Sequence, residues 1–153
     1  MYKKIAYVNL VRVINESPVG NLEAIRNNQV KEVLANAEMA AQEAYLSMTE
    51  DAIQKNRAVD VENINQLWVI EQQNARAISL RVIFKEIEKY RILEGLDVIL
   101  NSECVVSADK QYDVTDDIIL NLKDVNVDYG DLPGFTVIKQ EDVCDDEDGE
   151  RNS

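Results

Sequence analysis

The sequence predicts an α+β fold in which a small β body carries a long antiparallel helical hairpin. Three observations support this prediction. Apolar and small residues recur at steps of three and four over residues 17–95, which is the spacing of packed helices. Short runs of β-branched and apolar residues, each the length of a strand, lie on both sides of that stretch. A polar break near its middle lets the two helices fold back on each other.

The first strand is expected within residues 4–10, Lys-Ile-Ala-Tyr-Val-Asn-Leu, which are rich in strand-forming residues. Apolar side chains alternate onto both faces of this strand. We therefore expect it to be buried on both sides.

The hairpin is expected to begin at Ser17, which suits a helix cap, with Pro18 at the first helical position. The seam of the first helix is predicted at Val30, Leu34, Ala37, Ala41, Ala44, Met48 and Ala52. The seam of the second helix is predicted at Ile64, Trp68, Ala75, Ile78 and Val82. Residues 55–60 form the predicted polar break, and Gly95 is placed to end the second helix in a left-handed conformation.

The remaining elements follow the hairpin. Residues 96–101 and 104–107 predict the second and third strands, with Cys104 as a small buried residue. Residues 113–122 predict a short helix, for which Thr115 is the expected cap.

These elements define the expected domain organisation. The β body comprises residues 3–16 and 96–123, and the hairpin arm comprises residues 17–95. Residues 124–153 form an acidic tail that is expected to be flexible.

The net charge of −13 is unevenly distributed. Residues 96–153 carry sixteen acidic and four basic side chains, whereas residues 21–95 carry twelve acidic and nine basic ones. Because phosphate contacts need Lys and Arg, the charge argues against nucleic acid as a partner. The same acidity predicts that any contact with an anionic membrane is weak or absent.

The composition also argues against an enzyme. The chain has no histidine, so neither a Ser-His nor a Cys-His nucleophile can be assembled. It contains no glycine-rich phosphate-binding loop. We expect no catalytic residues, no cofactor and no metal. The two cysteines, Cys104 and Cys144, are compatible with free thiols or with a disulfide.

Two stretches resemble the Skp (OmpH) family of periplasmic chaperones. Residues 4–20, which end in Ser17-Pro18-Val19-Gly20, are similar to the strand-to-helix start of the mature family proteins. Residues 96–122 are similar to the closing strands and final helix, with Asp113-Val-Thr-Asp-Asp-Ile-Ile opening that helix. The resemblance covers roughly residues 3–123. In the helical arms it lies in the pattern of residues and not in their identity.

The resemblance implies a homotrimer with three prongs, in which strands from three subunits form a central body. The residues implied for this body are Ile5, Tyr7, Val98, Leu100 and Val105. It also implies that unfolded outer-membrane proteins are held between the helical arms without ATP.

The candidate client-binding residues on the arms are Tyr45, Met48, Ile53 and Trp68. The alternative interpretation is that such residues pack the two helices together. Lys55 and Arg57 are expected at the arm tip, either as a contact for a partner or as solvated surface.

The resemblance implies the periplasm if a signal peptide was removed, whereas a native start at Met1 implies the cytoplasm. Arg12 interrupts what would be the apolar core of a signal peptide.

Two functions remain: a holdase for unfolded proteins, or a structural coiled-coil adaptor for one folded partner. In either case two roles are open for the acidic tail: it keeps the empty trimer soluble, or it competes with clients for the cavity, the second being a hypothesis based on its charge and position.

Overall fold

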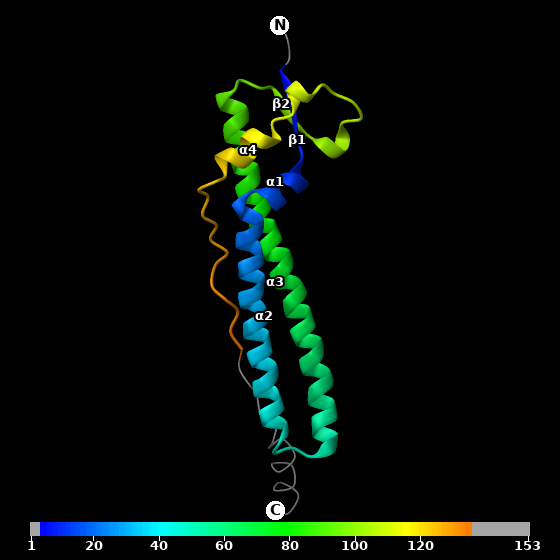
Figure 1. The fold of residues 1–153 in the computed structure, drawn as a ribbon. Helices are drawn as coiled ribbons and strands as arrows, with labels where there is room; N and C mark the ends of the chain where they lie inside the picture. The colour runs from blue at the N-terminus through cyan, green and yellow to red at the C-terminus, as the bar shows by residue number, and fades with distance from the viewer. Residues whose placement is uncertain (1–3, 136–153) are drawn as a thin grey trace, which may run out of the picture. The chain divides into compact units, whose positions relative to one another are not determined.

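The computed structural model describes residues 4–135, which divide into two compact units. Within the described chain, unit 1 comprises residues 4–28 and 72–130, and unit 2 comprises residues 29–71 and 131–135. The elements in order are β1 (Ile5–Val8), α1 (Leu10–Glu16), α2 (Pro18–Tyr45), α3 (Glu50–Leu93), β2 (Val98–Asn101), η1 (Ser102–Cys104), η2 (Lys110–Tyr112) and α4 (Thr115–Asn121). Both α2 and α3 contribute to both units (Figure 1). The predicted fold class, a small β element with a long helical hairpin, is confirmed.

Unit 1 contains a two-stranded parallel sheet, in which Ile5 pairs with Val98 and Val8 pairs with Asn101. One face of β1 is buried in the core of the unit. That core is formed by Ala6, Val8, Val13, Val19, Ile83, Val114, Ile118 and Leu122. The prediction that β1 is buried on both faces is wrong, because Ile5 on the other face is 45% exposed.

A short helix that the sequence analysis did not identify, α1, lies between β1 and α2. Asn9 caps it by accepting a hydrogen bond from the Arg12 N–H. Ser17 lies directly before Pro18 as expected, but its buried hydroxyl has no hydrogen-bond partner within residues 4–135. The predicted Ser17 side-chain cap is therefore not formed. Gly20 explains the tight turn between the helices, since a Cβ there would lie 2.2 Å from the Ile14 carbonyl oxygen.

The end of α3 agrees with the prediction for Gly95, which has a φ of +64°. The Leu96 N–H donates to the Arg91 carbonyl at 2.9 Å, and the Gly95 N–H donates to the Ile92 carbonyl at 3.2 Å. This pair of bonds is the Schellman arrangement, which satisfies carbonyls left free at the end of a helix.

The short helix α4 is confirmed, although its cap differs from the expected one. Asp113 accepts hydrogen bonds from both the backbone N–H and the hydroxyl of Thr115. The Thr115 hydroxyl oxygen in turn accepts from the Asn9 N–H at 2.9 Å. Thr115 thus joins α4 to the end of β1, and Asp113 performs the capping.

The segment after α4 contacts unit 1, although the sequence analysis assigned it to the tail. Val125 and Val127 pack against the core. The hydroxyls of Tyr129 and Ser79 are 2.8 Å apart, and Arg26 donates to the Gly130 carbonyl at 3.0 Å. The segment is therefore attached to the helices of unit 1 as far as Gly130.

In unit 2, residues 29–45 of α2 and residues 50–71 of α3 form an antiparallel pair around a turn at residues 46–49. The predicted break at residues 55–60 is wrong, because these residues are helical. Thr49 begins α3, and its hydroxyl oxygen accepts from the Ala52 N–H at 3.3 Å. Lys55 and Arg57 consequently lie within α3 and not in the turn.

The predicted third strand at residues 104–107 is also wrong. Cys104 ends the 3₁₀ turn η1 and is exposed, so it is not the buried residue expected. Asn101 starts this turn by accepting a hydrogen bond from the Glu103 N–H at 3.3 Å. Cys144 lies outside the described residues.

Among the described helices, none is long and apolar enough to cross a membrane.

Candidate functional site

The uncovered face of the sheet is the first candidate surface. The register of β1 and β2 places Ile5, Tyr7, Val98 and Leu100 on this face, which we call the open sheet face. Ile5 is 45% exposed and Val98 and Leu100 are each 40% exposed, while Tyr7 is half-buried. Parallel sheets in proteins are normally covered on both faces. The open sheet face is therefore a partly exposed apolar surface in the single chain.

The two edges of the sheet differ. β1 has a second neighbour, because the Val114 N–H donates to the Tyr7 carbonyl at 3.0 Å and Tyr7 bridges to Asp113. No strand pairs with the outer edge of β2 within residues 4–135. Four of the five residues predicted for the trimer body lie on the open sheet face, whereas Val105 follows η1 outside the sheet.

Tyr45 is the central polar contact of the helix pair in unit 2. It is 7% exposed, and its hydroxyl donates to the Asp60 carboxylate on α3. The Arg57 guanidinium lies 5.7 Å from the centre of the Tyr45 ring. Burial, followed by the hydrogen bond to Asp60, raises the pKa of Tyr45 to about 12. Tyr45 therefore faces α3, where its hydroxyl is satisfied.

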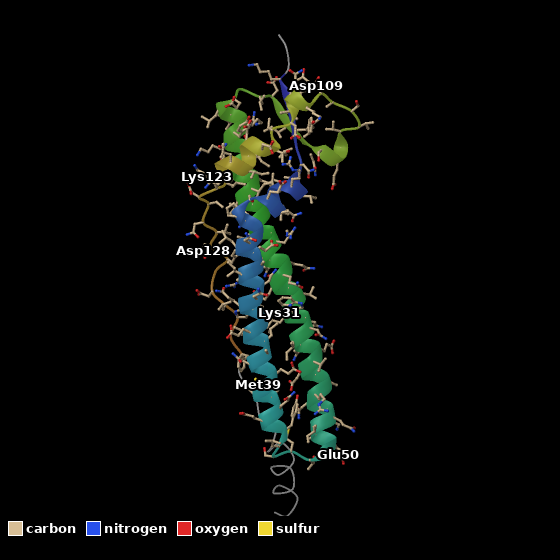
Figure 2. The ribbon with its side chains drawn as sticks, in the orientation of Figure 1. Lys31, Met39, Glu50, Asp109, Lys123 and Asp128 are labelled. Carbon is tan, nitrogen blue, oxygen red and sulfur yellow. The ribbon has the colours of Figure 1, made fainter. Side chains whose placement is uncertain are left out.

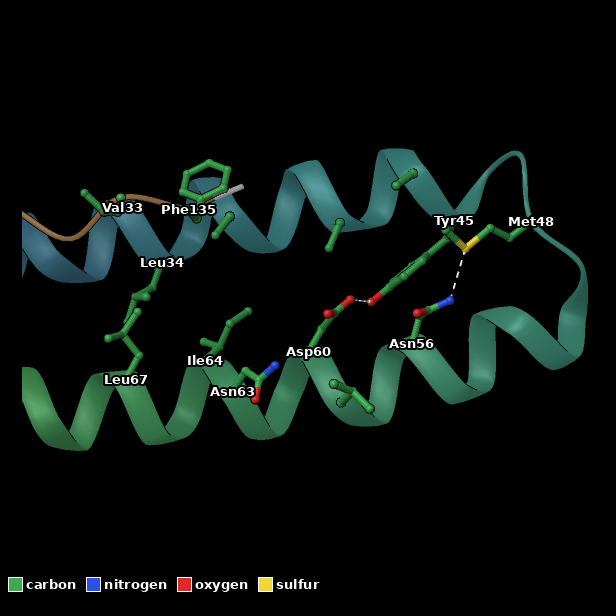
Figure 3. Close-up of a pocket in the computed structure, with 15 residues that line it drawn as sticks. Val33, Leu34, Tyr45, Met48, Asn56, Asp60, Asn63, Ile64, Leu67 and Phe135 are labelled. Atoms are coloured by element: carbon green, nitrogen blue, oxygen red, sulfur yellow. Dashed lines mark hydrogen bonds between the residues drawn. The ribbon is translucent and has the colours of Figure 1, made fainter. Parts of the chain in front are cut away.

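A cavity of about 320 Å³ lies between the two helices of unit 2, and we call it the α2/α3 pocket (Figure 3). Its lining residues are Val33, Leu34, Ala37, Ala41, Ala44, Tyr45, Met48, Asn56, Val59, Asp60, Asn63, Ile64, Leu67, Gly134 and Phe135. The seam of α2 supplies three alanines, and the opposite part of α3 supplies short polar side chains. Because these side chains are small, the helices leave space between them that tight seam packing would fill.

Met48 lies at the end of the pocket near the turn. Its sulfur accepts a hydrogen bond from the Asn56 side-chain amide at 3.4 Å, and that amide also donates to the Ala52 carbonyl at 2.9 Å (Figure 3). The short helical stretch after the turn is thus tied to the turn itself.

The outer surface of unit 2 exposes many large apolar side chains. Among residues 50–71 of α3, none is buried. Five large apolar residues of this unit's helices and turn that do not line the pocket are about half exposed or more: Met39 at 62%, Leu46 at 87%, Val61 at 50%, Val69 at 48% and Ile70 at 49%. Met39 is labelled on α2 in Figure 2. This is apolar surface that a polypeptide could cover.

The other predicted arm residues occupy varied positions. Ile53 is half-buried in α3 and is not part of the pocket lining. Trp68 is half-buried, and the Lys31 ammonium lies 5.5 Å from the centre of its ring. Lys55 is exposed on α3. The structure brings Tyr45 and Met48 together in the α2/α3 pocket, whose lining excludes Ile53 and Trp68.

No group of three or more potential metal ligands occurs in the part of the chain that the structure describes. Three of the four polar side chains that line the α2/α3 pocket are hydrogen-bonded, in the Tyr45–Asp60 and Asn56–Met48 pairs, and Asn63 is the fourth. The arrangement offers apolar contact and does not present a cluster of reactive groups.

The comparisons with known proteins show a distant structural similarity. The sequence matches no protein-family model, and no curated protein matches it. Among solved structures, the chain is similar to an OmpH-like outer membrane chaperone from Caulobacter crescentus CB15, with 16% sequence identity and a TM-score of 0.39. The alignment covers 80% of this chain and 85% of that chain. At this identity and TM-score, the similarity carries no argument about what this chain does.

Proposed function

We propose that this chain is an ATP-independent holdase that binds unfolded proteins on its helical hairpin and acts as a homotrimer. The observation that carries the proposal is the exposed apolar surface of unit 2, where no residue of α3 between positions 50 and 71 is buried. Apolar area left in water is unfavourable, by roughly 25 cal/mol for each Å². An unfolded chain that covers this surface would recover that free energy.

The distribution of the exposed residues supports binding of unfolded chains. The exposed apolar side chains are spread along the helices, and charged residues lie between most of them. Such a surface makes many weak contacts and selects no single sequence. When several arms hold one client, their weak contacts act together, because each later contact forms at a high effective concentration.

Self-association is proposed through the open sheet face. Its apolar residues, Ile5, Tyr7, Val98 and Leu100, remain partly exposed in the single chain. Covering them with equivalent surfaces would complete the burial that parallel sheets normally have. The resemblance of the two terminal motifs to the Skp (OmpH) family favours three copies. The same resemblance favours the periplasm as the location and outer-membrane proteins as the clients.

The test combines native mass spectrometry with an aggregation assay. The protein is measured alone and after mixing with a urea-unfolded outer-membrane β-barrel protein that is diluted into buffer. We expect a species of three chains of 17.4 kDa each, which gains the mass of one client. We also expect less light scattering from the client. A monomer that leaves client aggregation unchanged would contradict the proposal.

A double substitution separates assembly from client binding. Val98→Lys and Leu100→Lys place charges on the open sheet face and are expected to give monomers with native helical content. The matched control is Val106→Lys, because Val106 lies outside the sheet and is 103% exposed. If the double variant remained a trimer, the open sheet face would not be the interface.

The adaptor for one folded partner remains the second candidate. The adjacent exposed residues Val69 and Ile70 on α3 favour it, because one folded partner can cover such an apolar patch. A holdase reduces the aggregation of several unrelated clients, whereas an adaptor binds one protein at a fixed ratio and leaves those clients unaffected.

A further inference from the structure

The α2/α3 pocket has one wall that does not come from the helices. Gly134 and Phe135 line it, and they belong to residues 131–135, which form neither helix nor strand. The segment that carries Phe135 runs beside α2, close to Val33 (Figure 3). Phe135 is 48% exposed, so about half of this side chain is covered. An extended stretch of polypeptide that presents a large apolar side chain therefore already lies at the pocket.

The pocket walls suit such a side chain. Leu34, Ala37 and Ala41 of α2 lie opposite Ile64 and Leu67 of α3. The volume of about 320 Å³ is at the lower end of the range for ligand sites, roughly 300–1,000 Å³. It can hold one or two large side chains and is too small for a folded element. Phe135 lines the pocket without filling it.

Three of the four polar side chains that line the pocket, all except Asn63, are already hydrogen-bonded. The Tyr45 hydroxyl is bonded to Asp60, and the Asn56 amide is bonded to Met48 and to the Ala52 carbonyl. A ligand that needed these groups would have to break existing hydrogen bonds, with a cost of about 1 kcal/mol or more for each. The unoccupied part of the pocket is therefore suited to apolar contact.

We propose that the α2/α3 pocket binds a large apolar side chain of an extended client segment, and that Phe135 is the chain's own tethered competitor for this site. The inference rests on the proposed holdase function and names the client chemistry that the pocket accepts. A tethered competitor acts at an effective concentration that reaches the millimolar range for short linkers. Weak contact of Phe135 is then enough to keep the pocket occupied when no client is present.

A client cannot bind while Phe135 occupies the pocket. The apparent Kd for clients therefore rises with the fraction of time that Phe135 spends there. If Phe135 occupies the pocket for two thirds of the time, only one third of the molecules can bind, and the apparent Kd is about three times the intrinsic value. Replacing Phe135 with alanine removes the competitor and should recover this factor. The substitution changes an exposed segment and leaves both helices intact.

The first measurement titrates the full-length protein with the peptide acetyl-Asp-Leu-Pro-Gly-Phe-amide and follows the alanine methyl signals by NMR. We expect Phe135→Ala to bind the peptide more tightly than the unmodified protein does, by about threefold at an occupancy of two thirds. Leu132→Ala is the matched control, because Leu132 lies in the same segment, is 42% exposed and does not line the pocket. Adding Ala41→Leu to Phe135→Ala fills the pocket and should remove the gain.

The second measurement compares the same variants as inhibitors of client aggregation. We expect Phe135→Ala to need about threefold less protein for half-maximal suppression than the Leu132→Ala control. Equal peptide affinities for Phe135→Ala and the unmodified protein would overturn the competitor role, even if all variants suppressed aggregation. Tighter peptide binding without any suppression of aggregation would instead overturn the proposed holdase function.

Discussion

The substitution Gly20→Ala tests how α1 and α2 fit together in unit 1. A Cβ at position 20 would lie 2.2 Å from the Ile14 carbonyl oxygen and 3.2 Å from the carbonyl carbon. Real Cβ atoms remain at least 3.0 Å from such atoms, so the two helices would have to move apart by about 0.8 Å. Both atoms belong to the backbone of α1, so no side-chain rotation can relieve the contact.

Two opposing effects determine the magnitude. Alanine favours a helix interior over glycine by roughly 0.5–1 kcal/mol. Overpacking of well-packed atoms costs about 1–3 kcal/mol. Because the contact involves rigid backbone, we expect overpacking to prevail and the free energy of unfolding to fall by about 1–2 kcal/mol. In a chain of this size, that loss lowers Tm by about 2–8 °C.

The assay is thermal and urea unfolding followed by circular dichroism, at one fixed protein concentration because self-association would shift Tm. Asn21→Ala is the control, since Asn21 is exposed on the same turn of α2 and should change the stability by less than about 0.5 kcal/mol. If Gly20→Ala were as stable as the unmodified protein, the close contact between α1 and α2 would be refuted.

Three further substitutions test other contacts. Ile118→Ala removes a side chain that is 0% exposed, and we expect urea unfolding to show a loss of about 2–5 kcal/mol. Arg76→Met removes the bidentate partner of the Glu23 carboxylate, and Glu23 is 6% exposed. We expect the free energy of unfolding to fall by about 1–3 kcal/mol. The raised pKa of Tyr45, about 12 against 10.0, means that the folded state favours the neutral hydroxyl. That stabilisation is complete below pH 10 and is lost as the pH rises towards 12, so the stability advantage over Tyr45→Phe should shrink across this interval.

The first two substitutions each have a control variant, and the third has a direct assay. Leu120→Ala changes a 60% exposed residue on the same helix as Ile118 and should have little effect. Arg81→Met changes an exposed arginine of α3 and should leave the stability within about 0.5 kcal/mol. Absorbance at 295 nm reports tyrosinate directly, and ionisation of every tyrosine near pH 10 would contradict the raised pKa of Tyr45.

Local signals in the sequence predicted the end of α3 and the positions of both strands. Gly95 ends α3 because only its left-handed conformation allows both closing hydrogen bonds. The strands at Ile5–Val8 and Val98–Asn101 lie inside the predicted ranges. α1 was missed although Asn9 carries a capping signal, because the apolar run of the strand continues into the helix without a break.

The turn of the hairpin could not be located from periodicity. The steps through Ala41, Ala44, Met48 and Ala52 stay regular, although the chain reverses at residues 46–49 without glycine or proline. The polar stretch 55–60 is helical because tertiary contacts use its polar groups, as the Tyr45–Asp60 bond illustrates.

The third strand and the pocket depend on contacts between segments that are far apart in the sequence. Val105 and Val106 favour a strand, but no neighbouring strand pairs with them in the described chain. The contact of Phe135 with the pocket depends on where the extended segment lies, which local sequence does not determine. Four of the five residues predicted for the trimer body share the open sheet face, and their exposure became visible only with the register of β1 and β2.

The parallel pairing of β1 with β2 has a consequence for the order of folding. Ile5 and Val98 are partners although 93 residues separate them, so forming the sheet first would close a very long loop. The reversal at residues 46–49 is local, and helical pairing around it can precede the sheet. During synthesis, β1 emerges first and has no partner until nearly two thirds of the chain has been made. We therefore expect the sheet to close last, so that only a chain with a completed hairpin presents the face through which copies would assemble.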